Sequence, residues 1–279
     1  MKKQQIILVS SGFLSLILLF FLGKTTTPKI NKITASGPLT EKIIESGKLI
    51  THARERLTPT QLQWISSLEN SVKRGDVKIQ QINVYRRLAD FWRDSIHLFE
   101  PYAYYTAEAA KLENSEKSLT FAAHLFFTNL KSESDPPMQR WLATNAKDLF
   151  SRALQINPAN DSSKIGMGAC YIFGNLSDNP MEGISLIREV IQRDPQNMYG
   201  QFILGLGGIK SGQYDKAIEK FKIVVAQEPR NVEAMLNLAE TYDRKGEKAA
   251  AVRWYKNVKV NVNNADAQKE LDARIKTLQ

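Results

Sequence analysis

The amino-acid sequence predicts an all-helical protein in which stacked helix pairs follow one membrane-spanning helix. Two observations lead to this fold class: an uncharged apolar run near the N-terminus, and a motif that returns after 34 residues in the C-terminal half. The composition agrees, because 43% hydrophobic and 24% charged residues over 279 positions are typical of a globular chain that can bury a large core. Nothing in the sequence indicates strands.

The apolar run occupies residues 4–23, which carry no charge between Lys3 and Lys24. At about 1.5 Å per residue, a helix of this length spans about 30 Å, the thickness of a bilayer's hydrocarbon core. The flanking lysines can extend their ammonium groups to the lipid headgroups. We therefore expect a membrane anchor at 1–24 and a flexible linker, rich in Thr, Pro and Gly, at 25–38.

A cleaved signal peptide is the alternative for the same segment, because the start MKKQQ has the basic character of an n-region. The run is long for a signal sequence, and FLGKTTTPKI offers no A-x-A-like cleavage site, so the sequence favours an uncleaved anchor. Because lysines flank the apolar run on both sides, the positive-inside rule does not decide the orientation of the anchor in the membrane. Since signal-like N-termini normally stay in the cytoplasm, we expect a single-pass protein of a bacterial cell membrane with its C-terminal domain in the periplasm.

Charge is concentrated next to the apolar run. Of the formal net charge of +9, five lysines and no acid fall in residues 1–37. Residues 38–279 carry 33 basic and 29 acidic side chains. Such a balance argues against a nucleic-acid partner, and binding of nucleic acid or anionic lipid through basic charge is the less favoured alternative.

No catalytic or metal-binding pattern is present in the sequence. Cys170 is the one cysteine, which excludes an intramolecular disulfide and a multi-cysteine metal site. The three histidines do not have metal-ligand spacing, and no phosphate-binding loop or nucleophile motif occurs. We expect a non-enzymatic protein without a cofactor, and Cys170 as a small buried side chain.

Helix-ending prolines organise the C-terminal half. Pro158, Pro195 and Pro229 each follow an amide or acidic residue, and the last two lie 34 residues apart. Counted from Met198 and from Val232, positions 8 and 20 are small and positions 7 and 24 are large and apolar. Small residues fit where two antiparallel helices cross, and large ones fill the space beside the crossing. In chain order these residues are Leu204, Gly205, Ala217 and Phe221, then Leu238, Ala239, Ala251 and Tyr255.

Another unit begins at Asp161 and carries Tyr171 at position 11. Tyr242 holds position 11 in the last unit, whereas Gly208 occupies it in the middle unit. An aromatic ring is therefore missing from the middle unit, and we expect its packing to be looser there.

Two proline pairs predict helix starts further upstream. Thr58-Pro59 has the residue types of an N-cap and a first helical position, so a helix is expected over 59–74. Asp135-Pro136 gives the same signal for another helix.

The repeated pattern resembles the tetratricopeptide repeat, strongly over residues 140–263 and weakly over 80–140. This resemblance implies a right-handed superhelix of antiparallel helix pairs. We accordingly expect repeats at 114–263, a helical region with a degenerate repeat at 39–113, and a capping helix at 264–279.

The resemblance also implies a binding surface. In that family the concave face, lined by positions 2, 5, 9, 12 and 13 of each first helix, binds proteins or peptides. Carried over by position, the groove residues here are Ile165, Ala169, Ile172, Tyr199, Phe202, Leu206, Ile209 and Glu240. A mostly apolar groove suits an amphipathic helix or an apolar peptide. Because exposed apolar area is usually covered, an outside partner, the chain's own N-terminal helices and a second copy all remain candidate occupants.

The expected function is a non-catalytic scaffold that holds another protein at the membrane through this groove. The alternative is a periplasmic or secreted carrier or adaptor that signal cleavage releases.

Overall fold

The computed structural model describes residues 44–74, 77–176 and 180–279, which belong to one compact unit. The anchor expected at 1–24 and the linker at 25–38 lie outside these residues. Throughout the described ranges the regular elements are helices, without a strand, so the all-α prediction is confirmed for them. None of these helices has both the length and the apolar character needed to cross a bilayer.

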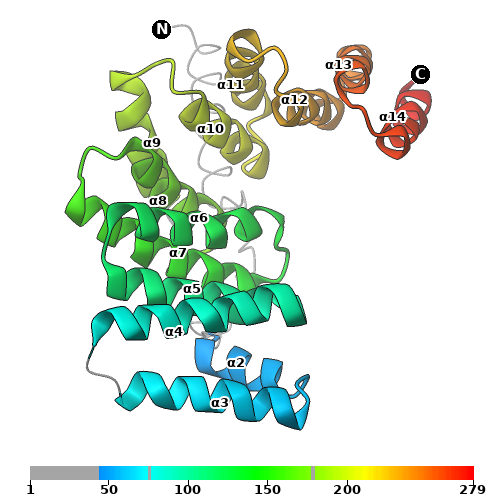
Figure 1. Ribbon diagram of the computed structural model, residues 1–279. Helices are drawn as coiled ribbons and strands as arrows, with labels where there is room; N and C mark the ends of the chain where they lie inside the picture. Colours follow the sequence, from blue (N-terminus) through cyan, green and yellow to red (C-terminus); the bar gives the residue numbers. More distant parts are fainter. Residues whose placement is uncertain (1–43, 75–76, 177–179) are drawn as a thin grey trace, which may run out of the picture. The chain divides into compact units, whose positions relative to one another are not determined.

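From α3 to α14 the described helices stack in chain order, whereas α2 packs on α5 (Figure 1). The N-terminal elements are α2 (Ser46–Arg54), α3 (Pro59–Arg74), α4 (Lys78–Phe91), a π-helical turn (Trp92–Ile96) and α5 (Phe99–Glu113). The next are α6 (Glu116–Ser132), α7 (Pro136–Ile156), α8 (Asp161–Phe173), α9 (Met181–Arg193), α10 (Met198–Lys210), α11 (Tyr214–Gln227), α12 (Val232–Lys245), α13 (Lys248–Asn261) and α14 (Ala265–Leu278).

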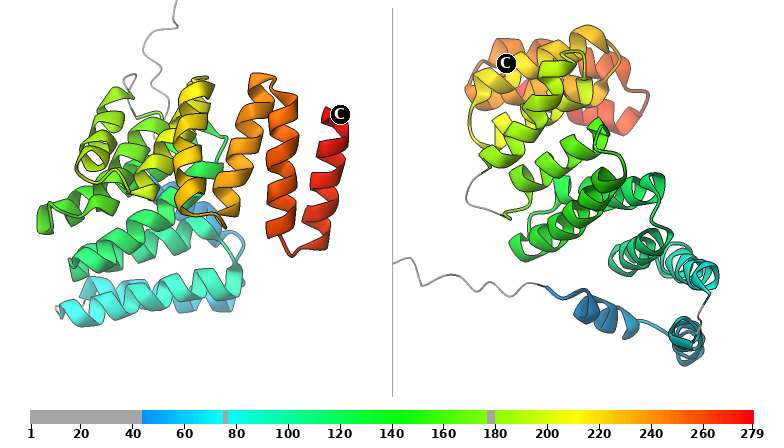
Figure 2. Two further views of the ribbon diagram at one scale, coloured as in Figure 1. Left: turned by 90° about the horizontal axis from the view of Figure 1, so that it is seen from above. Right: turned by 90° about the vertical axis from the view of Figure 1, so that its left-hand side faces the viewer.

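Helix pairing follows the repeat. The antiparallel hairpins are α6 with α7, α8 with α9, α10 with α11, and α12 with α13. In Figure 2 the helices α12, α13 and α14 lie side by side at the C-terminal end. The last helix is held by an ion pair between Arg274 and Asp243 and by a second one between Lys259 and Asp272, 2.7 Å apart.

Capping side chains explain where the first helices begin. Asn160, Asn197 and Asn231 each accept a hydrogen bond from the backbone N–H of the third residue of the helix, at 2.8, 2.9 and 2.9 Å. This satisfies one of the amide groups that a helix start leaves without an intrahelical partner. The predicted starts further upstream are confirmed, because α3 begins at Pro59 and α7 at Pro136.

Small residues sit where the paired helices cross. The crossing of α8 and α9 is so close that a Cβ atom on Gly183 would meet the carbonyl oxygen of Gly168. A Cβ atom on Gly205 would lie 2.6 Å from the ring of Phe221, which fills the space beside the crossing of α10 and α11. Ala217 is completely buried at the same crossing. These contacts give the physical reason for the small residues at positions 8 and 20 of the repeat.

Two hydrophobic cores follow one another along the chain. The larger core runs from α5 to α14 and includes the fully buried Phe150 and Phe221. The smaller core joins α2, α3, α4 and α5 around Ile65, Leu88 and Trp92, each of which is fully buried. Helix α5 belongs to both, because Tyr105 packs into the smaller core and alanines of the same helix pack into the larger one.

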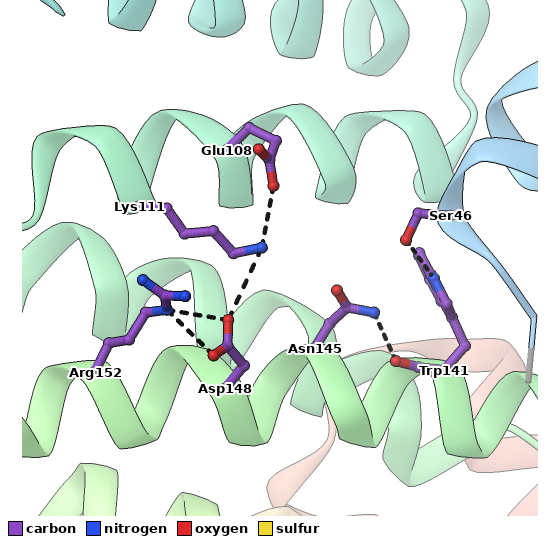
Figure 3. A network of polar contacts seen from close by, with 7 residues as sticks. All are labelled: Ser46, Glu108, Lys111, Trp141, Asn145, Asp148 and Arg152. Carbon is purple, nitrogen blue, oxygen red and sulfur yellow. Dashed lines mark hydrogen bonds and ion pairs between the residues drawn. The ribbon is translucent and has the colours of Figure 1, made fainter.

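Polar contacts tie the two cores together. Figure 3 shows Lys111 of α5 between two carboxylates, 3.0 Å from Glu108 and 3.9 Å from Asp148 of α7. In the same view the indole Nε1–H of Trp141 on α7 donates to the hydroxyl of Ser46 on α2, at 3.0 Å. Helix α2 therefore packs on α5 and reaches α7, which are not the helices that carry the predicted groove residues.

Candidate functional site

The first helices of successive hairpins form the inner face of the stack. Helix α8 packs against both α6 and α10, and α10 also packs against α12. Lys131, near the end of α6, forms an ion pair of 3.3 Å with Glu233, in the first turn of α12. These two residues are 102 positions apart in sequence. The inner face therefore curves tightly enough for the end of α6 to meet the beginning of α12.

This curvature changes the accessibility of the predicted groove residues. Ile165 and Ala169 are completely buried, and Ile172 and Phe202 are only 7% and 8% exposed. Helix α6 covers α8, and Gly200 brings α10 so close that a Cβ atom there would lie 3.4 Å from Ile165. In this conformation these four side chains are core residues and offer a ligand almost no surface.

The other four predicted residues are partly accessible. Tyr199, Leu206, Ile209 and Glu240 are each half-buried. They lie on α10 and α12, the first helices of the last two hairpins. No contact with a ligand tests these assignments, and the binding role of all eight residues stays a prediction.

One pocket opens on this part of the inner face, with a volume of about 240 Å³. We call it the inner pocket. Helix α10 supplies its apolar wall, and its polar edge comes from α6 and from the start of α12. Its lining residues are Lys131, Met198, Tyr199, Phe202, Ile203, Glu228, Asn231 and Glu233. The structure thus brings Tyr199 and Phe202 together with Glu233, at position 2 of its repeat, and with Lys131 of α6, which sequence reasoning missed because the repeat register has decayed there.

The wall next to the inner pocket is electrically neutral. Tyr199 has a buried phenol oxygen without a hydrogen-bond partner among the described residues, and burial raises the pKa of this phenol above its ordinary value. The ring of His124 lies 6.1 Å from the Tyr199 ring, and its Nε2 lies 2.9 Å from the hydroxyl of Ser162. Burial lowers the pKa of His124, so its imidazole is uncharged at neutral pH. The charged residues of the inner pocket, Lys131, Glu228 and Glu233, therefore lie at its edge.

The expectation from the sequence is that the chain holds no metal site and no reactive cysteine. No three metal-ligating side chains come together in the described ranges. Cys170 is completely buried, as the sequence predicted, and desolvation raises the pKa of its thiol to about 12. A protonated thiol is a poor nucleophile, so this cysteine has a packing role.

These features define a solenoid of helical hairpins with a small pocket of mixed apolar and charged lining on its inner face. The tetratricopeptide-repeat family profile matches residues 209–269, which confirms the resemblance for that segment. No curated protein matches the chain.

Several solved structures are similar to the chain. One is PilW, described as a widely conserved type IV pilus biogenesis factor, with 19% identity, 70% of this chain and 92% of that chain covered, and a TM-score of 0.47. A second is YrrB, described as a TPR protein with an unusual peptide-binding site, with 16% identity, 75% and 99% coverage, and a TM-score of 0.42. A third is MamA from Desulfovibrio magneticus RS-1, with 19% identity, 67% and 96% coverage, and a TM-score of 0.43.

Proposed function

We propose that the protein is a membrane-anchored, non-catalytic scaffold that holds a protein partner through the inner face of its helical repeats. The inner pocket is the observation that carries this proposal. It lies on α10 and α12, within or next to the segment that matches the tetratricopeptide repeat. An apolar wall with charges at its edge is the usual composition of a protein-binding surface.

The chemistry of the inner pocket defines the partner it suits. Met198 and Tyr199 are half-buried and form the accessible part of an apolar wall that can take an apolar side chain, whereas Phe202 and Ile203 are only 8% and 1% exposed. Lys131 and Glu233 stand at the edge as a pair of opposite charges. A short amphipathic helix fits this arrangement, because it inserts apolar anchors on one face and presents polar residues beside them.

The anchor at residues 4–23 would confine this surface to the membrane and raise its effective concentration for a membrane-bound partner. Substituting Leu14→Arg places a charge at the centre of the apolar run, where insertion costs about 2.5–3.5 kcal/mol. We expect the wild type to stay in the membrane pellet after alkaline carbonate extraction and the variant to be partly released. An N-terminus near Lys24 in the mature protein, found by mass spectrometry, would support the cleaved alternative instead.

The groove is tested by photocrosslinking in intact cells, with the full-length chain. Benzoylphenylalanine replaces Tyr199, which lines the inner pocket, or Val260, which is 84% exposed on the second helix α13. We expect one defined adduct from position 199 and none from position 260. Substituting Ile209→Glu on α10 should reduce the adduct, while Val260→Glu should leave it unchanged. Equal adducts at both positions, or an adduct only at 260, would assign binding to another face.

A further inference from the structure

A second pocket lies between the α8–α9 and α10–α11 hairpins and has a volume of about 270 Å³. We call it the position-11 pocket, because Gly208, at position 11 of its repeat, lines it. It shares no lining residue with the inner pocket. Its apolar wall is made by Ile172, Ile184, Ile191 and Leu204.

The neighbouring repeats fill the corresponding space with an aromatic ring and a cation. Tyr171, at position 11 in α8, lies under the ammonium group of Lys147 on α7, at 4.8 Å from the ring centroid. Tyr242, at position 11 in α12, lies under Lys222 of α11, at 5.8 Å. In both cases the cation comes from the second helix of the preceding hairpin.

The middle repeat keeps the cation and lacks the ring. Arg188 on α9 directly follows Ile187 at position 24, just as Lys222 directly follows Phe221 at position 24. Arg188 lines the position-11 pocket and has no ion pair or hydrogen bond within the described part of the chain. The pocket lies beside Gly208, at the repeat position that carries a ring in the neighbouring units, and a Cβ atom on Gly208 itself would lie 3.0 Å from Ala217.

The charge around this pocket is mostly positive. Arg188, Lys216 and Lys220 line it, and Glu219 is the one acidic residue among the lining side chains. Glu219 is paired with Lys220 at 2.9 Å, and Lys216 donates to the neutral side chain of Gln213 at 2.6 Å. The surplus of cations favours an occupant that carries negative charge.

We propose that the position-11 pocket binds one aromatic side chain of a partner polypeptide, at a point where acidic residues flank that side chain. The ring replaces the missing position-11 aromatic and lies under the guanidinium of Arg188, where a cation–π contact is favourable. The flanking carboxylates lie near Lys216 and Lys220. This site shares no lining residue with the inner pocket, so the binding role of either pocket can fail without the other.

Saturation-transfer difference NMR on the full-length protein tests the proposal, because it detects weak binding through the ligand's own protons. The probes are a short peptide with Tyr between two Asp residues, the same peptide with Leu in place of Tyr, and free 4-hydroxyphenylacetate. We expect the Tyr peptide to bind at least about fivefold more tightly than the Leu peptide, the contrast that cation–π and ring packing give.

Variants of the chain locate the binding. Arg188→Gln should weaken the Tyr peptide about fivefold. Lys222→Gln is the matched control and should change nothing, because Tyr242 already supplies the ring there. Gly207→Phe should abolish binding by filling the pocket: a Cβ atom at Gly207 comes no closer than 3.4 Å to Ile172, so the helix tolerates a side chain. Circular dichroism checks that each variant is folded.

Several outcomes would overturn the proposal. These are equal binding of the Tyr and Leu peptides, unchanged binding by folded Gly207→Phe, and the same loss in Lys222→Gln as in Arg188→Gln. Binding of 4-hydroxyphenylacetate as tightly as the peptide would make the pocket a small-molecule site, and absence of any peptide signal would reject the site.

Discussion

The N-terminal helices α2 to α5 and the repeats from α8 to α13 are held together in different ways. In the repeats, the same small residues, the same large ones and the same asparagine caps return in each hairpin. In the N-terminal region, Arg54 of α2 pairs with Glu69 of α3, and Tyr105 of α5 donates to the same carboxylate. The contacts of the repeats can form again in every added hairpin. The contacts that join Arg54, Glu69 and Tyr105 form only between α2, α3 and α5.

The residues at which helices end also differ between the repeats and the N-terminal region. In the repeats α12 ends at Gly246, whose φ of 86° is easy for a residue without a Cβ atom. In the N-terminal region α4 runs into the π-helical turn, which ends at His97 with a φ of 58°. The His97 Nδ1 atom lies 2.9 Å from the carbonyl oxygen of Arg93. The local contact holds a conformation that the residue type alone disfavours.

The largest expected loss of stability comes from removing a large side chain at the centre of a repeat. Phe221→Ala removes a completely buried ring that packs against Gly205 and Phe202. We expect a loss of about 3–5 kcal/mol in the free energy of unfolding, because a cavity remains after the ring is removed. Urea unfolding followed by circular dichroism measures it. A loss below about 1 kcal/mol would mean that the hairpin collapses around the cavity.

The same substitution in the two regions should have opposite effects. Gly183→Ala forces a Cβ atom against the carbonyl of Gly168, so we expect a loss of about 1–3 kcal/mol. Gly47→Ala in α2 meets nothing within 4 Å and should raise stability by about 0.5 kcal/mol, because alanine favours the helix. Thermal unfolding of both variants gives the comparison, and changes of the same sign would contradict it.

Alkaline pH should weaken the N-terminal region. Burial raises the pKa of Tyr105, and its hydrogen bond to Glu69 adds to the shift; burial also raises the pKa of Tyr85 and Tyr104. Because the folded-state pKa lies above the unfolded value of about 10, this stabilisation is complete below about pH 10 and is lost as pH rises through the folded pKa.

The variant Tyr105→Phe isolates one of these phenols. We expect the fall of unfolding free energy above about pH 10 to become shallower, by up to about 1.4 kcal/mol per pH unit. Urea unfolding at about pH 8 and about pH 11 measures the slope. Tyr214→Phe, at the start of α11, is the matched variant in the repeats. Identical slopes for wild type and Tyr105→Phe would reject the assignment.

The smallest effect concerns the reactivity of a buried thiol. Because burial raises the pKa of Cys170 to about 12, alkylation near neutral pH should be slow and should follow transient opening of α8. Ala89→Cys in a Cys170→Ala background places a thiol in the N-terminal core, where Ala89 is 4% exposed. Comparing the two alkylation rates shows which region opens more often. Immediate reaction of Cys170 in the folded protein would contradict its burial.

Much of the repeat fold follows from the sequence. Helices α8, α10 and α12 begin at Asp161, Met198 and Val232, the residues from which the repeats were counted. Periodicity reveals this because each hairpin solves the same packing problem with the same residue types. The contacts of the N-terminal region were not predictable in this way, since Arg54 and Tyr105 meet Glu69 only through tertiary packing.

Less of the candidate site was predictable. The repeat positions identified which residues face inward, and Tyr199 and Phe202 do line the inner pocket. They did not reveal that α6 covers Ile165 and Ala169, because the curvature of the stack depends on the packing of α6, where the pattern is weakest. The absence of a ring at Gly208 was visible in the sequence, but the cation that remains beside it emerged only from the structure.

The ion pair between Lys131 and Glu233 also bears on cooperativity. In an ideal solenoid each repeat interacts only with its neighbours, so stability is a sum of repeat and interface energies, and unfolding can proceed stepwise from an end. A contact between α6 and α12 joins hairpins that are not adjacent along the chain. At this partly exposed position the pair contributes at most about 1 kcal/mol, so fraying of α12 would cost α6 no more than this amount.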